Sequence, residues 1–355
     1  MNARYTPPLA PNRMQQAKIP YSARRVPLSA MALLVQDATP RPGDLVLARI
    51  DKLGQHKNLE LTTGRRARLF PGDEIVLAYG NRYAPDQFEA EIPEDLTACH
   101  MVAAGGIASR MLSRHDRISA ATGITPLGLI ADHSGRVLNL RQHALDHAGL
   151  DVHARVPTFA VVGTSMNAGK TETATHMIRG LSQAGYKVGA AKVTGTGAGG
   201  DVWSLTDAGA SIVLDFTDAG FPSTYLTELR DLEEILHTLT RQLYKAGVDC
   251  VVIEVADGLF QRETAMLLES PRFAETVDGI VFASPDPMGA LAGMQWLRER
   301  KLPVRAVSGR MTASPLAARE AQAALNLPVL DLEGLSSPGI ADTLGVKKER
   351  LEAVR

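Results

Sequence analysis

The sequence has few cysteines, a net charge close to zero and no apolar run that approaches the ~20 residues needed to span a bilayer. Its two cysteines, Cys99 and Cys250, stand far apart and outside any CxxC pair, which argues against a thiolate zinc site. Two cysteines in 355 residues are typical of a reducing compartment, so we expect a cytoplasmic protein. The net charge of −1 gives no indication of a nucleic acid or a membrane as a partner.

The first 36 residues lack acidic side chains and a secretory core. No apolar stretch precedes Ala30, so a signal peptide is not expected, and the first acid is Asp37. Prolines are frequent there, and the segment carries five cations, Arg4, Arg13, Lys18, Arg24 and Arg25. We predict a basic, flexible tail over residues 1–36. An arm that binds a partner or a nucleic acid is the alternative.

The chain is long enough for two domains, because one core rarely exceeds about 250–300 residues. Short β-rich runs separated by turn residues fill residues 43–100, a pattern typical of a small β-barrel or a rolled sheet. Residues 101–156 are predicted to be mostly helix and loop, with one strand at 127–131, and to include the connector. The predicted β-rich N-terminal domain therefore covers residues 37–156.

Residues 157–355 alternate short apolar runs with helical stretches, which predicts an α/β domain with a parallel sheet covered on both faces. One helix follows Lys170 and is closed by Gly185; another is predicted to have Asp231 as its N-cap and Gly247 at its end. Ligands of such sheets bind beyond the carboxyl ends of the strands. The predicted strands cover residues 158–162, 187–193, 211–216, 250–255, 279–283, 304–308 and 329–332.

A glycine-rich segment between the first of these strands and the first helix ends in Gly-Lys-Thr, which predicts a phosphate loop. Glycine lets backbone N–H groups approach phosphate, and the helix adds its positive N-terminal end. Lys170 is placed to reach the terminal phosphates, and the hydroxyl of Thr171 to ligate Mg²⁺. The nucleotide-binding residues that we predict are Gly163, Thr164, Asn167, Ala168, Gly169, Lys170, Thr171 and Glu172.

The first glycine of this loop stands one position earlier than in the common G-x-x-x-x-G-K-[ST] pattern, with Thr164 in its usual place. The longer spacing resembles the loop of dethiobiotin synthetase and the cobyrinic acid amide synthases, within the broad class that also holds signal-recognition and MinD-type NTPases. The resemblance covers residues 157–335 and implies a P-loop NTPase domain. It leaves residues 1–150 unassigned.

Two further residues stand at the ends of predicted strands. Lys192 looks like the strand-end lysine that contacts substrate or phosphate in the dethiobiotin synthetase group. Glu254 lies within an otherwise apolar strand, where a buried acid needs a partner, and we predict that it organises Mg²⁺ together with Thr171. Asp257 is the second choice for that carboxylate.

The loops after other strands carry weaker signals. The glycine-rich stretch 194–200 is expected to be a flexible substrate or switch loop, and Asp201 after it is a candidate for orienting water or metal, with a helix N-cap as the equal alternative. Asp218 is a candidate for positioning an acceptor, although a turn residue is favoured there. Arg310 is placed to contact phosphate or base.

We therefore expect an ATP- and Mg²⁺-dependent enzyme that transfers, or activates with, the γ-phosphoryl group on an unidentified small-molecule acceptor, as a kinase or a ligase. Lys170, Lys192, Asp201 and Asp218 are its candidate catalytic residues. The alternative is a nucleotide-hydrolysing switch that binds a protein partner or loads a cofactor. GTP is not excluded, because no N-K-x-D motif reads the base. A homodimer is left open, and no nucleic acid or membrane partner is expected.

Overall fold

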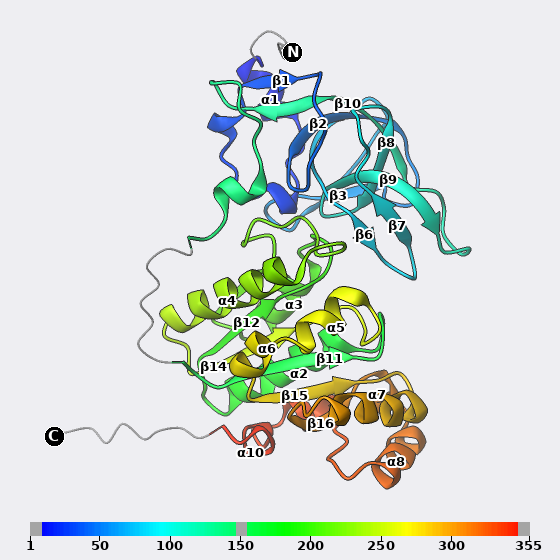
Figure 1. The fold of residues 1–355 in the computed structure, drawn as a ribbon, viewed down its shortest axis with the longest axis vertical. Coiled ribbons are helices and arrows are strands. Elements are labelled where there is room, and N and C mark those ends of the chain that lie inside the picture. The colour runs from blue at the N-terminus through cyan, green and yellow to red at the C-terminus, as the bar shows by residue number, and fades with distance from the viewer. Residues whose placement is uncertain (1–8, 147–154, 347–355) are drawn as a thin grey trace, which may run out of the picture. The chain divides into compact units, whose positions relative to one another are not determined.

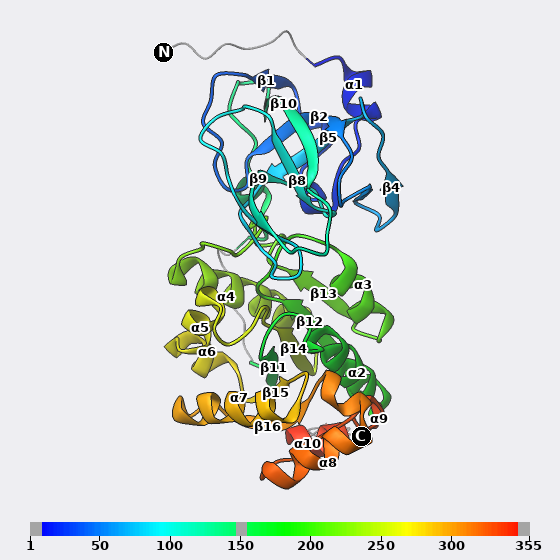
Figure 2. The same cartoon turned by 90° about the vertical axis from the view of Figure 1, so that its right-hand side faces the viewer.

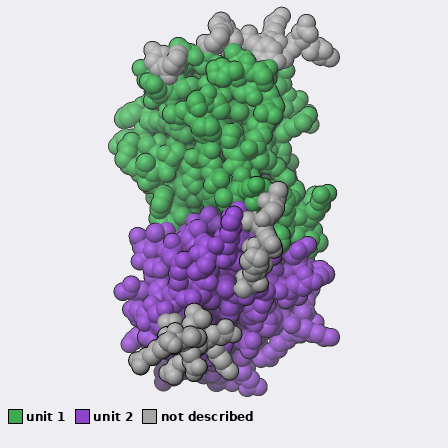
Figure 3. All heavy atoms as spheres, turned by 90° about the vertical axis from the view of Figure 1, so that its left-hand side faces the viewer, with its two compact units in different colours: residues 1–148, 194–203, 215–238 green, residues 149–193, 204–214, 239–355 purple. Residues whose placement is uncertain are grey.

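The computed structural model describes residues 9–146 and 155–346. The chain divides into two compact units, coloured separately in Figure 3: unit 1 holds residues 1–148, 194–203 and 215–238, and unit 2 holds residues 149–193, 204–214 and 239–355. Two stretches from the C-terminal half of the chain therefore belong to unit 1. Within the described residues, no helix has both the length and the apolar character needed to cross a membrane.

Unit 1 is built mainly from strands, which occupy the blue to cyan part of the chain in Figure 1. Its short helical segments are α1 (Pro11–Gln16), η1 (Tyr21–Ala23), η2 (Leu28–Ala30) and η3 (Leu140–His143). Its strands are β1 (Leu33–Val35), β2 (Leu45–Lys52), β3 (Asn58–Glu60), β4 (Arg66–Arg68), β5 (Glu74–Tyr79), β6 (Arg82–Tyr83), β7 (Phe88–Glu91), β8 (Cys99–Ala103), β9 (Ile107–Arg114) and β10 (Thr122–Ala131).

Five of these strands close into a barrel. β2 pairs with β5 and with β10, β5 pairs with β9 in parallel, and β8 pairs with both β9 and β10. Alternate residues such as Val46, Ile75, Met101 and Ile124 form a buried core inside the ring, as expected when successive side chains of a strand point to opposite faces. Of the two predicted forms, a small β-barrel or a rolled sheet, the structure shows the barrel, and it extends beyond residue 100.

The prediction of mostly helix and loop over residues 101–156 is wrong for its first half. β9 and β10 both lie there, and β10 is ten residues long. Its burial alternates from Thr122 to Leu127 before the strand becomes fully buried. Gly123, Pro126 and Gly128 interrupt the apolar pattern, because the strand bulges at these residues where it pairs with β2.

Residues 9–36 differ from the expected flexible tail, since they pack on the barrel. Met14, Ala23 and Leu34 join barrel residues in a second buried cluster. Lys18 pairs with Ile75 as an isolated β-bridge, and Arg13 forms an ion pair with Glu74. The sequence predicts a solvated tail from its cations, but some of these cations form ion pairs with acidic residues of the barrel. Residues 1–8 lie outside the described residues.

Unit 2 and its connections alternate strands with helices, as predicted. The strands are β11 (Thr158–Gly163), β12 (Val188–Lys192), β13 (Ile212–Asp215), β14 (Cys250–Glu254), β15 (Gly279–Ala283) and β16 (Val304–Ser308). The helical segments are α2 (Lys170–Gln183), α3 (Gly200–Asp207), α4 (Leu229–Lys245), α5 (Arg262–Leu268), α6 (Pro271–Thr276), α7 (Pro287–Glu299), η4 (Arg310–Ala313), α8 (Pro315–Ala324), α9 (Leu332–Ser336) and α10 (Ile340–Leu344).

The six strands form one sheet in the order β13-β12-β14-β11-β15-β16, and the pairings from β12 to β16 are parallel. Helices α2 and α9 cover one face, while α5, α6 and α7 lie on the other (Figure 2). The α/β class with a parallel sheet and a smaller β-rich N-terminal part is confirmed. The central strand β11 leads into the predicted phosphate loop, so this loop lies at the carboxyl edge of the sheet.

Helix α2 packs on the sheet through the stripe that its sequence predicts. Ala174, Met177, Ile178 and Leu181 are buried against strand residues, and Gly185 follows the helix end with φ 83°, as a C-cap glycine should. Two details differ. The predicted strand at 329–332 is only an isolated bridge from Val329 before α9, and Asp231 lies in the first turn of α4 rather than at its N-cap.

Candidate phosphate-binding site

The segment from Gly163 to Lys170 is a tight loop between β11 and α2. Asn167 has φ 64° and Gly169 has φ 99°, so two left-handed residues turn the chain just before the helix. Such turns direct successive N–H groups into an anion-binding concavity. A Cβ on Gly169 would lie 2.9 Å from the backbone nitrogen of Arg310, so both its conformation and its surroundings require glycine.

Lys170 does not point into solvent. It is 6% exposed, and its Nζ donates a hydrogen bond to the carbonyl of Ser165, five residues earlier, at 2.8 Å. The ammonium therefore lies across the opening of the loop, where a phosphate would be bound. A lysine that merely began a surface helix would not lose its hydration in this way, because burial of a cation is unfavourable without partners.

Thr171, Glu254 and Lys192 meet beside the loop at the ends of three elements. Thr171 Oγ1 donates to Glu254 Oε1 at 3.2 Å, and Lys192 Nζ lies 3.9 Å from the same oxygen. Glu254 is 2% exposed. β12 and β14 are paired so that Lys192 stands opposite Glu254, which is why two strand-end residues 62 positions apart reach one another. The structure thus brings together three residues that the sequence predicts for the site.

Backbone hydrogen bonds hold the loop from the side of β15 and β16. Thr164 N–H donates to the carbonyl of Ala283 at 3.1 Å, and Arg310 N–H donates to the carbonyl of Ala168 at 2.9 Å. Ser284 and Ser308 connect the ends of the two strands to each other through a further backbone bond. The loop is fixed before any ligand binds, which lowers the cost of binding an anion.

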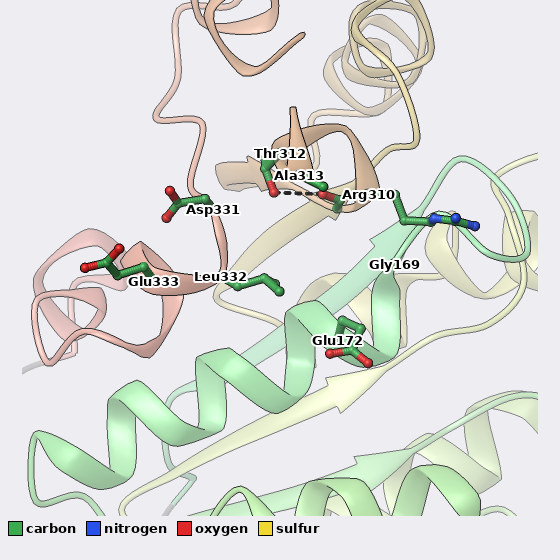
Figure 4. A pocket seen from close by; sticks show the side chains of 9 residues that line it. Gly169, Glu172, Arg310, Thr312, Ala313, Asp331, Leu332 and Glu333 are labelled. Atoms are coloured by element: carbon green, nitrogen blue, oxygen red, sulfur yellow. Dashed lines mark hydrogen bonds between the residues drawn. The ribbon is translucent and has the colours of Figure 1, made fainter. Parts of the chain in front are cut away.

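A cavity of about 380 Å³ opens next to Gly169 (Figure 4). It lies between the first turn of α2, the segment after β16 and the start of α9. The side chain of Arg310 extends away from Asp331 and Glu333, which lie on the opposite side of the cavity (Figure 4). Its lining residues are Gly169, Glu172, Gly309, Arg310, Thr312, Ala313, Asp331, Leu332 and Glu333.

Two candidate catalytic residues, Asp201 and Asp218, belong to unit 1. Asp201 lies in the first turn of α3. Asp218 is 6% exposed, and Arg24 Nη2 lies 2.6 Å from its Oδ2. Burial and the neighbouring Asp215 raise the pKa of Asp218, while Arg24 opposes the shift. Asp218 therefore belongs to a buried charge cluster in unit 1.

Sequence reasoning missed the residues that anchor the loops after β12 and β13. Tyr21 OH donates to Asp215 at 2.8 Å, and the carboxylate of Glu60 accepts hydrogen bonds from Gly199 and Trp203. The sequence predicts a flexible stretch at 194–200, whereas the structure shows it held by hydrogen bonds to Glu60, Pro222 and Thr224. One feature of the sequence does indicate such a residue: Glu60 is an acid within a β-rich run, and a buried carboxylate there requires hydrogen-bond donors.

Comparison with solved structures finds similarity over somewhat more than half of this chain. FtsY from Mycoplasma mycoides matches with 15% identity over 55% of this chain and 70% of that chain, at a TM-score of 0.38. Signal recognition particle 54 kDa protein from Aeropyrum pernix K1, in complex with GDP, matches with 20% identity over 58% of this chain and 50% of that chain, at a TM-score of 0.36.

The septum site-determining protein MinD from Pyrococcus horikoshii OT3, complexed with Mg-ADP, matches with 15% identity over 54% of this chain and 94% of that chain, at a TM-score of 0.35. Membership in the dethiobiotin synthetase group stays a prediction. At these identities and TM-scores the likenesses assign no activity to this chain. No protein-family model and no curated protein matches it.

Proposed function

We propose that this protein binds a nucleoside triphosphate with Mg²⁺ at residues 163–171 and hydrolyses it as a molecular switch. The observation that carries the proposal is the position of Lys170, whose buried ammonium lies across the loop at 2.8 Å from the carbonyl of Ser165. A triphosphate supplies oxygens that replace this carbonyl. Backbone N–H groups and the N-terminus of α2 then complete a cradle of positive potential.

The residues beside the loop fit a magnesium ion. Thr171 offers a hydroxyl and Glu254 a carboxylate, both hard oxygen ligands of the kind that Mg²⁺ prefers, within 3.2 Å of each other. Bound there, the ion would neutralise charge on the β- and γ-phosphates. Lys192 Nζ lies 3.9 Å from the same Glu254 oxygen and can neutralise further negative charge.

The reaction that we propose is hydrolysis. Water attacks the γ-phosphorus, the bond from that phosphorus to the β,γ-bridging oxygen breaks, and the nucleoside diphosphate and inorganic phosphate leave. The proton of the attacking water goes to the phosphate that forms. The residues act by placement and electrostatics: Lys170 stabilises the transferring group, and the loop amides hold the β-phosphate.

The nucleoside end of the ligand fits the cavity next to Gly169, because that cavity opens directly from the phosphate loop. Glu172, Asp331 and Glu333 place carboxylates around it, which accept hydrogen bonds from amino groups of a base. Adenine and guanine both carry such groups, so both ATP and GTP are candidates.

A switch is favoured over transfer to a small acceptor by the loops after β12 and β13. Asp218, the candidate for positioning an acceptor, is buried and ion-paired with Arg24. Both loops are part of unit 1, so chain segments that leave the nucleotide-binding sheet continue into the other unit. A connection of this kind suits a protein in which hydrolysis changes the binding of a protein partner or of a second copy.

Phosphate release from ATP·Mg²⁺ and GTP·Mg²⁺ tests the proposal. We expect slow hydrolysis of at least one of them by the purified chain, and its loss in Lys170→Ala. The matched control is Lys245→Ala, which removes an exposed lysine near the end of α4. Unchanged hydrolysis in Lys170→Ala would falsify the proposal. Rapid phosphorylation of a metabolite in a mixture of small molecules would instead favour a kinase.

A further inference from the structure

The loop after β12 is held by one buried carboxylate of the barrel unit. Glu60, at the end of β3, is 2% exposed. Its Oε2 accepts a hydrogen bond from Gly199 N–H at 2.9 Å, and its Oε1 accepts one from the indole Nε1–H of Trp203 at 3.0 Å. Glu60 thus joins the end of the glycine-rich stretch to the first turn of α3.

Further contacts within unit 1 fix the same loop. A Cβ on Gly105 would lie 2.0 Å from the carbonyl of Gly197, so the two backbones approach as closely as two glycines allow. Gly197 N–H donates to the carbonyl of Pro222 at 2.9 Å. The ring of Tyr21 meets the ring of Trp203 edge-on, with centroids 6.2 Å apart. Glu60 is the charged centre of this arrangement.

Along the chain, the other end of the loop follows directly after the end of β12, which carries Lys192 of the candidate nucleotide site. Lys192 is the last residue of β12 and faces Glu254. The next residue, Val193, donates its N–H to the carbonyl of Glu254 at 2.9 Å. Thr194 then begins the stretch that belongs to unit 1. One residue therefore separates the lysine of the site from the loop that Glu60 holds.

We propose that Glu60 is a positioning residue for the nucleotide site, acting through the loop 194–203 on the carboxyl end of β12 and on Lys192. This inference rests on the proposed function. Charge-assisted hydrogen bonds from a buried carboxylate are among the stronger ones in proteins. With the loop ordered in advance, nucleotide binding does not have to order it, and the loop responds when phosphate draws Lys192 away from Glu254.

The fluorescence of Trp203 can report on this loop, because its indole Nε1–H donates a hydrogen bond to Glu60. The chain has two tryptophans, so a Trp296→Phe background leaves Trp203 as the only one. Its emission is followed during titration with ATP·Mg²⁺ and with GTP·Mg²⁺, while calorimetry measures the dissociation constant independently. In this background we expect the emission to change with the dissociation constant that calorimetry gives.

Glu60→Ala in the same background should abolish this emission change and weaken nucleotide binding by about five-fold or more, the lower end of typical coupling between sites. The matched control is Glu74→Ala, which removes a carboxylate of the same unit that accepts two hydrogen bonds from Arg13 and does not touch the loop. Glu74→Ala should show the same emission change and the same dissociation constant as the background.

Glu60→Gln keeps the side-chain volume and one hydrogen-bond acceptor, so its emission change and affinity should lie between those of the background and of Glu60→Ala. This variant replaces Glu60→Ala in the test if Glu60→Ala does not fold.

The two proposals fail in different ways. Binding by calorimetry without any change in Trp203 emission overturns the role of Glu60 and leaves nucleotide binding intact. Equal affinity and equal emission change in the Glu60 variants and the background do the same. If calorimetry detects no binding of either ATP·Mg²⁺ or GTP·Mg²⁺, the proposed function is overturned, and the positioning role of Glu60 with it.

Discussion

The ammonium of Lys170 donates a hydrogen bond to the carbonyl of Ser165 within the same loop, at 2.8 Å. This contact places the cation where phosphate oxygens are expected, and the left-handed turn at Asn167 and Gly169 has the backbone conformation typical of anion-binding loops. The lysine contributes charge and the amides contribute shape. These two contributions can be separated experimentally, because only the first depends on a side chain.

The first prediction concerns this lysine. Lys170→Ala should weaken triphosphate binding by about ten- to 150-fold, because a hydrogen bond to a charged group contributes roughly 1.5–3 kcal/mol. Titration calorimetry measures the change, and circular dichroism checks that the fold persists. Lys245→Ala should bind as the wild type does. Equal affinity in Lys170→Ala and the wild type would mean that the ammonium lies outside the ligand's reach.

The second prediction concerns the metal. Thr171→Val keeps the size of the side chain and removes the hydroxyl that contacts Glu254. We expect the Mg²⁺ concentration for half-maximal nucleotide hydrolysis to rise by about ten-fold or more, in the range found when groups that support a metal are removed. Thr171→Ser keeps the hydroxyl and should restore the wild-type Mg²⁺ dependence. Identical Mg²⁺ curves for the valine and serine variants would contradict the assignment.

Local chemistry explains why the strand, turn and helix around residues 163–171 could be predicted from the sequence. Strand, glycine turn, Gly-Lys-Thr and helix are adjacent in the chain, and the strand-end residues Lys192 and Glu254 follow from the rule that parallel strands end at one edge. Glu60 could not be assigned in this way, since Gly199 and Trp203 lie 139 and 143 residues away. The same holds for the membership of the segments 194–203 and 215–238 in unit 1, which depends on long-range packing.

The elements that the sequence did not predict correctly, strand β10 and the N-terminal segment, differ from the prediction for equally specific reasons. β10 contains Gly123, Pro126 and Gly128 where it bulges against β2, so its alternation of buried and exposed residues is disguised by residues that usually end strands. The N-terminal segment looked like a tail because its cations stand close together without acids. Their partners, such as Glu74 and Asp218, come from distant parts of unit 1.

The third prediction concerns pH and His56. Burial and the neighbouring Arg82 lower the pKa of His56 to about 4, and its ring lies 5.7 Å from that of Phe88. The unfolded chain binds this proton near pH 6.5, so the stabilisation is complete above that pH and is lost as pH falls toward 4. Between pH 7 and pH 5 this histidine should lower the free energy of unfolding by about 2 kcal/mol.

Urea unfolding at the two pH values measures this change, which His56→Gln should remove. The matched control is His133→Gln, at an exposed position of the same unit, and it should keep the wild-type dependence. Identical pH dependence in His56→Gln and the wild type would assign the loss of stability to other groups.

The fourth prediction concerns the buried charge cluster around Arg24. Its guanidinium lies 3.2 Å from Asp215 Oδ1 and 2.6 Å from Asp218 Oδ2. Removing it in Arg24→Met leaves two buried carboxylates together, so we expect a loss of about 3–5 kcal/mol in the free energy of unfolding. Arg25→Met, which removes a more exposed cation 3.7 Å from Asp218, should cost less than about 1 kcal/mol.

The pH dependence of Arg24→Met distinguishes lost charge pairing from lost packing. A carboxyl whose pKa is raised by burial holds its proton more tightly in the folded state than in the unfolded chain. Its contribution is therefore present below the ordinary aspartate pKa of about 3.9 and is lost as pH rises. Arg24→Met should approach wild-type stability as pH falls toward 4, and Asp218→Asn added to it should recover part of the loss at pH 7. A deficit that is the same at pH 7 and pH 4.5, with no gain from Asp218→Asn, would show that Arg24 acts through packing on Tyr21, whose ring it covers at 4.0 Å.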